Sequence, residues 1–100
     1  MVKWTIPARE DLKAIYSYIT LDSKFYAEKI IREIIDRAST IPDIPERGRI
    51  VPEVNEKDIR EIFIYSYRLI YQLSPKLITI LAVVHGSRNI TEYDIQKDLV

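Results

Sequence analysis

The chain has 100 residues, no cysteine, one histidine, two glycines and a formal net charge of zero. This length suits one domain with a single core, and the lack of cysteine excludes disulfides and thiolate metal sites and is typical of a reducing compartment. Zero net charge argues against a general polyelectrolyte binder, and no apolar run approaches the ~20 residues of a membrane helix. We therefore expect one cytoplasmic domain over residues 1–100, with no secretory signal and no membrane contact.

The N-terminus predicts a short strand followed by a helix. Val2, Trp4 and Ile6 alternate with polar residues, as in a strand with one buried face. Pro7 is tolerated in a first helical turn, where Glu10 and Asp11 would be well placed. The apolar residues that follow at helical spacing are Leu12, Ile15, Tyr16 and Ile19.

A second helix follows after a link of only a few residues. Asp22 or Ser23 can cap its N-terminus. Its predicted apolar face comprises Ala27, Ile30, Ile31, Ile34, Ile35 and Ala38. Because the link is short, the two helices should form an antiparallel hairpin.

The second half of the chain predicts a loop and then a sheet. Residues 42–49 contain prolines and a glycine that end the second helix, and residues 50–54 suit a short edge strand, because Pro52 cannot donate a ladder hydrogen bond. Strands are predicted at 59–65, 68–73 and 77–85, joined closely enough to form an antiparallel meander. The pattern leaves the structure of the tail, residues 91–100, undetermined, although Thr91 is a suitable cap for a short helical turn.

These elements make an α+β domain: an N-terminal strand, a helix hairpin, and an antiparallel β-meander with both helices on one sheet face. The last two strands are apolar on both faces, which is unusual for a sheet covered on one side. Either both faces are partly covered by the chain itself, or one apolar face is left for a partner.

Several cations fall at the ends of the predicted strands. We expect Arg60, Arg68 and Arg88 to converge at one sheet edge and bind an anion, since the arginine fork suits phosphate and carboxylate. Arg47 and Arg49 in the preceding loop are candidates for the same anion site. The alternative is that the arginines pair with nearby acids, as Arg68 would with Glu61 across a hairpin.

Other chemistries find little support. His85 is either a general acid or base, or a strand-end residue hydrogen-bonded to backbone. One histidine and no cysteine leave no ligand-spaced metal set, and no serine has a triad or glycine-rich phosphate loop around it. We expect no metal and no cofactor, and most of the seven tyrosines should serve packing.

Motifs along nearly the whole chain, from Trp4 to about Ile90, resemble the RelE/ParE superfamily of type II toxin–antitoxin toxins, on its ParE side. They are Ala8, Asp11-Leu12, Ile15, Tyr18-Ile19, Pro45, Gly48-Arg49, Pro52-Glu53, Ile59-Arg60-Glu61-Ile62, Tyr67-Arg68-Leu69-Ile70-Tyr71 and His85-Gly86-Ser87-Arg88. The resemblance implies growth inhibition, plasmid stabilisation and neutralisation by a cognate antitoxin. It is also compatible with a toxin dimer and with a toxin–antitoxin heterotetramer.

The resemblance leaves the target open between DNA gyrase and the ribosome. ParE-type relatives poison gyrase without being enzymes, whereas RelE-type relatives cleave mRNA on the ribosome. A nuclease here would use Arg60, Arg68, Arg88, His85 and Tyr93. The acids near the loop, among them Glu53, oppose a phosphate site by like-charge repulsion, which favours the ParE type. A decayed toxin that retains antitoxin binding is the third alternative.

The resemblance also implies a surface for an antitoxin helix or extended segment. An apolar groove beside the helix hairpin or a free sheet edge would suit such a partner. The candidate antitoxin-binding residues are Leu12, Tyr16 and Ile19.

Overall fold

The computed structural model describes residues 1–88 and residue 90, so the predicted tail and Tyr93 lie outside the described residues. The elements in chain order are β1 (Val2–Trp4), α1 (Ile6–Thr20), α2 (Lys24–Ser39), the 3-10 turns η1 (Ile41–Asp43) and η2 (Pro45–Arg47), β2 (Arg49–Ile50), β3 (Ile59–Ile64), β4 (Tyr67–Ser74) and β5 (Leu77–His85). None of the described helices is long and apolar enough to cross a bilayer.

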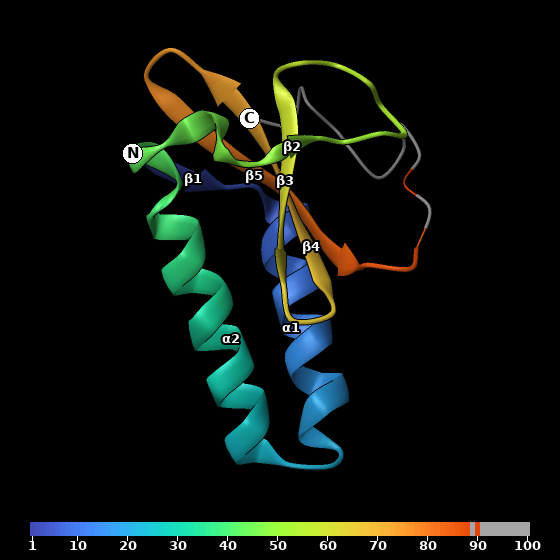
Figure 1. Cartoon of the computed structure of the whole chain (residues 1–100). Coiled ribbons are helices and arrows are strands. Elements are labelled where there is room, and N and C mark those ends of the chain that lie inside the picture. Colours follow the sequence, from blue (N-terminus) through green and yellow to red (C-terminus); the bar gives the residue numbers. More distant parts are fainter. Residues whose placement is uncertain (89, 91–100) are drawn as a thin grey trace.

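The strands form one five-stranded sheet in the order β1-β5-β4-β3-β2. Strand β1 pairs in parallel with β5, and all other pairs are antiparallel. The helix hairpin covers one face of this sheet and extends past the β3–β4 turn, so the free end of the hairpin overhangs the sheet (Figure 1). The predicted α+β class, with both helices on one face, is confirmed.

Both helices begin with a side-chain cap. The hydroxyl of Thr5 accepts a hydrogen bond from Ala8 N at 3.2 Å and donates one to Ile80 O at 3.0 Å, which ties the start of α1 to β5. Of the two predicted cap candidates, Asp22 and Ser23, the structure shows Ser23, whose side chain accepts a hydrogen bond from Tyr26 N. Because α1 begins at Ile6, its first turn contains no acid, and the expected placement of Glu10 and Asp11 there was wrong.

Asp11 instead joins α1 to the sheet. Its Oδ2 accepts a hydrogen bond from Val83 N at 2.9 Å, beyond the point where β1 stops pairing with β5. The carboxylate thus takes the place of a missing strand partner for this N–H group. This contact holds the hairpin at a defined angle along β5.

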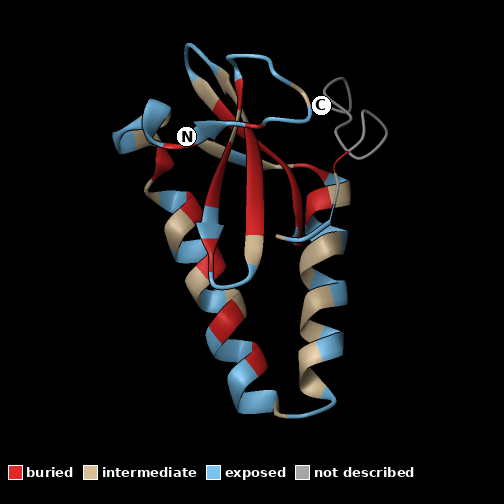
Figure 2. Ribbon diagram, turned by 45° about the vertical axis from the view of Figure 1, so that its right-hand side comes forward, coloured by how far each residue is buried: buried red, intermediate tan, exposed pale blue. Residues whose placement is uncertain are grey.

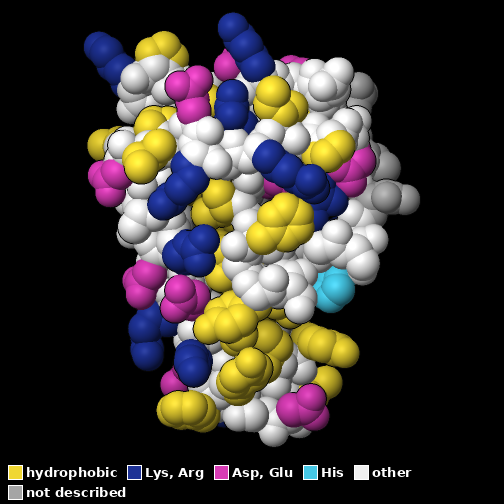
Figure 3. Space-filling view, in the orientation of Figure 1, with side chains coloured by type: hydrophobic (Ala, Val, Ile, Leu, Met, Phe, Trp, Pro, Cys, Tyr) yellow, Lys and Arg dark blue, Asp and Glu magenta, His cyan; other side chains and the backbone are white. Residues whose placement is uncertain are grey.

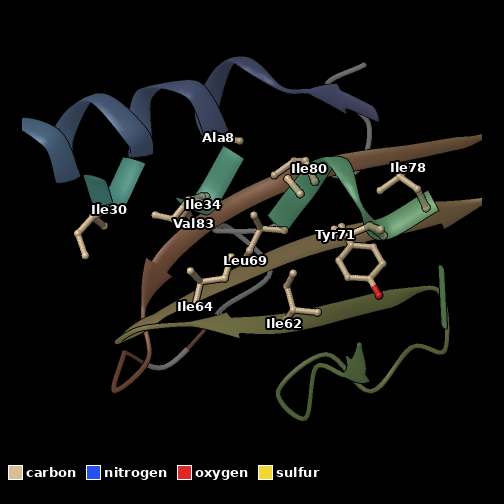
Figure 4. Packing of buried hydrophobic residues seen from close by; sticks show 12 residues of the cluster. Ala8, Ile30, Ile34, Ile62, Ile64, Leu69, Tyr71, Ile78, Ile80 and Val83 are labelled. Atoms are coloured by element: carbon tan, nitrogen blue, oxygen red, sulfur yellow. The ribbon is translucent and has the colours of Figure 1, made fainter. Parts of the chain in front are cut away.

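The main core lies between the hairpin and the sheet (Figure 4). Its helix-side members include Ile30 and Ile34, and its sheet-side members include Leu69 and Tyr71. The buried stripe of α2 is narrower than predicted, since Ile35 is 44% exposed on the far side of the helix. Figure 2 shows that buried residues are densest along the central strands; on the helices they lie mainly along α2, whereas Ala8 is the only buried residue of α1.

A second apolar cluster covers the opposite sheet face, and this decides between the two explanations for the doubly apolar strands. It comprises Val51, Ile59, Ile70, Leu81, Ala82, Val84 and Ile90. The chain's own segments, around Val51 and at Ile90, therefore cover the face that a partner might have filled. Both Leu81 and Ala82 reach this cluster because a bulge makes Leu81 an extra residue in β5.

The edge strand predicted at 50–54 is present, but it is shorter and covers only Arg49–Ile50. Strand β2 ends at Ile50, and the chain turns at once, with Val54 N and Asn55 N both donating to Val51 O. Tight turning buries Val51 under the sheet, which an extended strand at this edge would not have done.

Candidate functional site

The most enclosed charge is Arg68, on the sheet face away from the helices. Its Nε donates to Glu61 at 2.7 Å, and its two terminal nitrogens donate to the two oxygens of Glu53 at 2.9 and 2.8 Å. The Arg68 side chain is 4% exposed and that of Glu61 is 0% exposed. The alternative interpretation, in which the arginines pair with nearby acids, is confirmed for Arg68, which binds both Glu61 and Glu53.

These contacts extend into what we name the Arg68 network: Arg68, Glu53, Glu61 and Arg49. Arg49 donates from Nε to Glu61 at 2.5 Å, and its guanidinium lies 5.1 Å from the centroid of the Phe63 ring. Arg68 also donates to Arg88 O at 3.1 Å, and Glu53 accepts from Ile90 N at 3.2 Å. The network therefore joins the sheet to the segment around Glu53 and to the chain beyond β5.

The ion pair between Arg68 and Glu53 shifts the pKa of both side chains. The paired hydrogen bonds from Arg68 lower the pKa of Glu53 to about 2, against an ordinary 4.5, although burial acts in the opposite direction. The same hydrogen bonds raise the pKa of Arg68 above its usual value. Both groups are thus ionised throughout the neutral range, and the guanidinium donates to two carboxylates and to the carbonyl of Arg88.

This arrangement predicts a loss of stability in acid. The pKa of Glu53 is lower in the folded chain than in the unfolded chain, so its stabilisation is complete above pH 4.5 and is lost as the pH falls towards about 2. Thermal unfolding followed by circular dichroism should show the melting temperature dropping across this window. The variant Glu53→Gln should be less stable at pH 7 and should lose less on acidification; parallel curves for the two proteins would contradict the assignment.

Arg60 lies on the opposite face of the sheet from Arg68. It pairs with Tyr71 in the β3–β4 ladder, whereas Arg68 pairs with Phe63, and residues of opposite parity point to opposite faces. Its guanidinium donates to Lys57 O at 3.0 Å, Gly48 O at 2.9 Å and Glu46 O at 3.3 Å. The predicted convergence of Arg60, Arg68 and Arg88 was therefore wrong, because strand alternation separates the first two.

The structure does bring Arg60 together with Arg47, at the corner where η2 meets the sheet. Burial raises the pKa of the Tyr71 hydroxyl above its usual value. The positive charges of Arg60 and Arg47 act in the opposite direction and lower this pKa. That hydroxyl donates to Pro45 O at 2.8 Å and accepts from Gly48 N at 3.0 Å. Within residues 1–88 and 90, neither Arg47 nor Arg60 takes part in an ion pair, although Glu46 lies in the same turn as Arg47.

His85, at the end of β5, is a strand-end residue hydrogen-bonded to backbone, which is one of the two interpretations of its role given above. Its Nδ1 accepts from Ser87 N at 3.3 Å and lies 2.8 Å from Ser87 Oγ. Its ring meets Tyr67 edge-on, with centroids 5.9 Å apart. Because Tyr67 belongs to the helix side of β4, His85 and Arg68 do not face a common substrate position.

Two further groups of predicted residues have definite positions. Leu12 and Ile19 pack against the main core, whereas Tyr16 lines a hollow of about 310 Å³ on the hairpin's outer side with Ile31 and Ile35. Arg88 lies exposed beyond β5. No group of three or more histidine, aspartate or glutamate side chains in the described part of the chain could hold a metal ion.

Comparison with known proteins places this architecture among bacterial toxins. Residues 2–90 match the family model described as the ParE toxin of the type II toxin–antitoxin system parDE. Toxin RelE2 of Caulobacter vibrioides (strain ATCC 19089 / CIP 103742 / CB 15) is 30% identical over 88 residues, covering 87% of this chain and 96% of that protein. A solved structure described as the chromosomal ParDE TA system from P. aeruginosa is similar in fold, with a TM-score of 0.70, 24% identity, and coverage of 84% of this chain and 92% of that one.

Proposed function

The chain belongs to the ParE toxin family of type II toxin–antitoxin systems, and from this premise we propose that it inhibits growth by poisoning DNA gyrase and is neutralised by a cognate antitoxin. Its target would be met in the cytoplasm. The names of its relatives include both ParE and RelE, so the choice of target depends on the chain's own residues.

The observation that supports gyrase rather than mRNA as the target is that Arg68 is buried and ion-paired. Cleavage of RNA at a phosphate needs accessible cations aimed at the developing charge. Arg68 is buried and bound by Glu61 and Glu53, so a phosphate would have to displace two carboxylates to reach it. This supports the non-enzymatic ParE type over the RelE type.

The remaining arginines suit contact with a large anionic partner. Arg47 and Arg60 lie together near the Tyr71 hydroxyl without an ion pair among the described residues, and Arg49 is 57% exposed although it is paired with Glu61. In a complex of gyrase with DNA, these arginines would be attracted to the phosphate backbone. Arg88, which is also exposed, is a further candidate for the same contact.

For the antitoxin we propose the hollow on the outer side of the hairpin. Tyr16, Ile31 and Ile35 supply its apolar floor, and charged residues of both signs rim it: Glu28, Arg32 and Asp36. An amphipathic helix fits such a groove, with apolar side chains in the hollow and polar ones at the rim. Of the three predicted antitoxin-binding residues, only Tyr16 is turned towards this surface; Leu12 and Ile19 support it from the core.

A supercoiling assay with purified gyrase tests the proposal. Stoichiometric toxin should abolish supercoiling of relaxed plasmid and leave linear DNA after protease treatment, because the poison stalls gyrase with its DNA cleaved. Toxin mixed beforehand with the protein encoded by the neighbouring reading frame serves as the control and should leave gyrase active.

Other outcomes assign the chain differently. Unaffected gyrase together with arrested translation and codon-phased cuts in primer extension would establish the mRNA nuclease instead. Normal growth after induced expression without antitoxin would identify a decayed toxin.

A further inference from the structure

The free end of the helix hairpin and the β3–β4 turn form a hollow of about 670 Å³, which we name the aromatic hollow. Five tyrosine and phenylalanine side chains line it: Tyr18, Phe25, Tyr26, Tyr65 and Tyr67. Figure 3 shows hydrophobic side chains gathered over this lower part of the molecule. The volume falls within the roughly 300–1,000 Å³ of small-molecule sites, which are mostly lined by apolar and aromatic residues.

The charge of the aromatic hollow has one sign. Among the described residues that line it, Asp22, in the turn between α1 and α2, is the only acid, and none is a lysine or an arginine. Within residues 1–88 and 90, Asp22 takes part in no ion pair. Its backbone N–H donates to Ile19 O at 3.0 Å, which fixes the turn that carries the carboxylate. A ligand in the hollow therefore meets a negative charge without a basic side chain beside it in the described lining.

Tyr65 reaches the hollow from the β3–β4 turn, in a backbone conformation that tyrosine rarely adopts. Its φ is 55°, in the left-handed region that favours glycine at hairpin turns. Backbone strain of this kind is concentrated at ligand-binding and active sites. A tyrosine at a position that glycine would fit with less strain therefore supports a binding role for the hollow.

Tyr18, on α1, and Tyr67, on β4, are neighbours in the lining. Burial raises the pKa of the Tyr67 hydroxyl above its usual value, and the nearby Tyr18 raises it further. The Tyr67 phenol is therefore neutral at physiological pH. Its ring is held edge-on against His85, with centroids 5.9 Å apart and planes at 79°. This part of the lining is thus an uncharged aromatic surface supported by the sheet.

The combination of aromatic rings with a carboxylate favours a cation as the ligand. The quadrupole of an aromatic ring places negative charge over its face, so ammonium and guanidinium groups are attracted to it, and clusters of such rings recognise quaternary ammonium compounds. The Asp22 carboxylate attracts the same groups and repels anions.

We propose that the aromatic hollow binds a small organic cation. Its ammonium or guanidinium group would lie near Asp22, and its apolar body would pack on the tyrosine rings. The hollow shares no residue with the Arg68 network or with the hollow at Tyr16, so the proposal does not depend on which target the chain poisons or on where an antitoxin binds.

Nuclear magnetic resonance titration of the purified full chain with choline tests this site. The neutral comparison compound is 3,3-dimethylbutan-1-ol, in which a carbon atom replaces the quaternary nitrogen of choline and the shape is retained. Choline should shift the ring resonances of Tyr65 and Tyr67 and bind at least about fivefold more tightly than the alcohol, because only choline gains the cation–π contact and the carboxylate.

A parallel titration with N-acetylargininamide distinguishes the two sources of such a cation. Tighter binding of this compound than of choline would assign the site to an arginine side chain of a protein, and tighter binding of choline would assign it to a free ammonium compound. Both results support a cation site, provided that the cation binds more tightly than the neutral alcohol.

Two substitutions separate the contribution of charge from that of the rings. Asp22→Asn should remove most of the advantage of choline over the alcohol, whereas Asp43→Asn, which changes an exposed acid of η1 outside the hollow, should leave it unchanged. Tyr18→Leu keeps an apolar side chain at an exposed helical position but removes a ring, so it should weaken choline severalfold and leave the alcohol unaffected. Melting temperatures of all three variants should match that of wild type, since the positions are exposed.

Equal affinities of choline and the neutral alcohol for wild type would overturn the proposal. A preference for choline that both Asp22→Asn and Tyr18→Leu leave intact would overturn it as well, because the cation would then bind elsewhere. So would unshifted Tyr65 and Tyr67 ring resonances with all three compounds at tens of millimolar.

Discussion

Replacing Arg68 by methionine is expected to destabilise the fold by about 3–5 kcal/mol. The change removes the main partner of Glu61, whose side chain is completely buried, and leaves that carboxylate with Arg49 alone. It also releases Glu53, and with it the hydrogen bonds that fasten Arg88 and Ile90 to the sheet. Urea unfolding at pH 7 measures the loss.

The double variant Arg68→Met with Glu61→Leu is the informative control. Removing both buried charges together leaves no fully buried carboxylate without a cation, because Glu53, which also loses Arg68, is 25% exposed to solvent. Apolar replacements of similar volume are often neutral or stabilising at buried ion pairs. We therefore expect the double variant to recover most of the lost stability. A single variant as stable as wild type, or a double variant less stable than the single one, would show that the Arg68 network does not hold this face together.

Replacing Gly48 by alanine should have the second largest effect, a loss of about 2–4 kcal/mol from steric overlap and a broken hydrogen bond. A methyl group there would lie 2.5 Å from Tyr71 Oη and 2.6 Å from Glu61 O. The tyrosine is fully buried and the second contact is to strand backbone, so neither can move away at little cost. Displacing the hydroxyl would also break its bond to Gly48 N.

Gly86→Ala provides the matched comparison for this prediction. A methyl group at Gly86 would meet Ser66 O at 3.2 Å, a tight contact that a small shift can relieve, and Phe63 at 3.8 Å, an ordinary contact; neither glycine has a positive φ. Backbone conformation therefore cannot account for a difference between the two variants. We expect the loss at Gly86 to be at most about 1 kcal/mol, as for a small side chain at a loosely packed site. Equal losses at both positions, measured by urea unfolding, would refute the steric explanation.

The sequence by itself determined the elements and their arrangement in layers. The 3.6-residue spacing on α2 and the close connections between the last three strands are local properties, and they predicted the hairpin, the meander and the cap at Ser23 correctly. The pair of Arg68 with Glu61 is a diagonal contact on one sheet face, because Arg68 lies opposite Phe63 and Glu61 is two residues from Phe63 on the same strand.

Only the tertiary structure decided which charges share a surface. Convergence of Arg60 and Arg68 depends on strand parity and on what covers each face, and Glu53 reaches Arg68 from a segment whose turn at Val51 the sequence pattern did not show. The exposure of large apolar side chains at the free end of the hairpin, among them Leu21 and Phe25, likewise follows from how far the hairpin extends past the sheet. Local spacing encodes periodicity, whereas overhang, coverage and ion pairing arise from contacts between residues far apart in the chain.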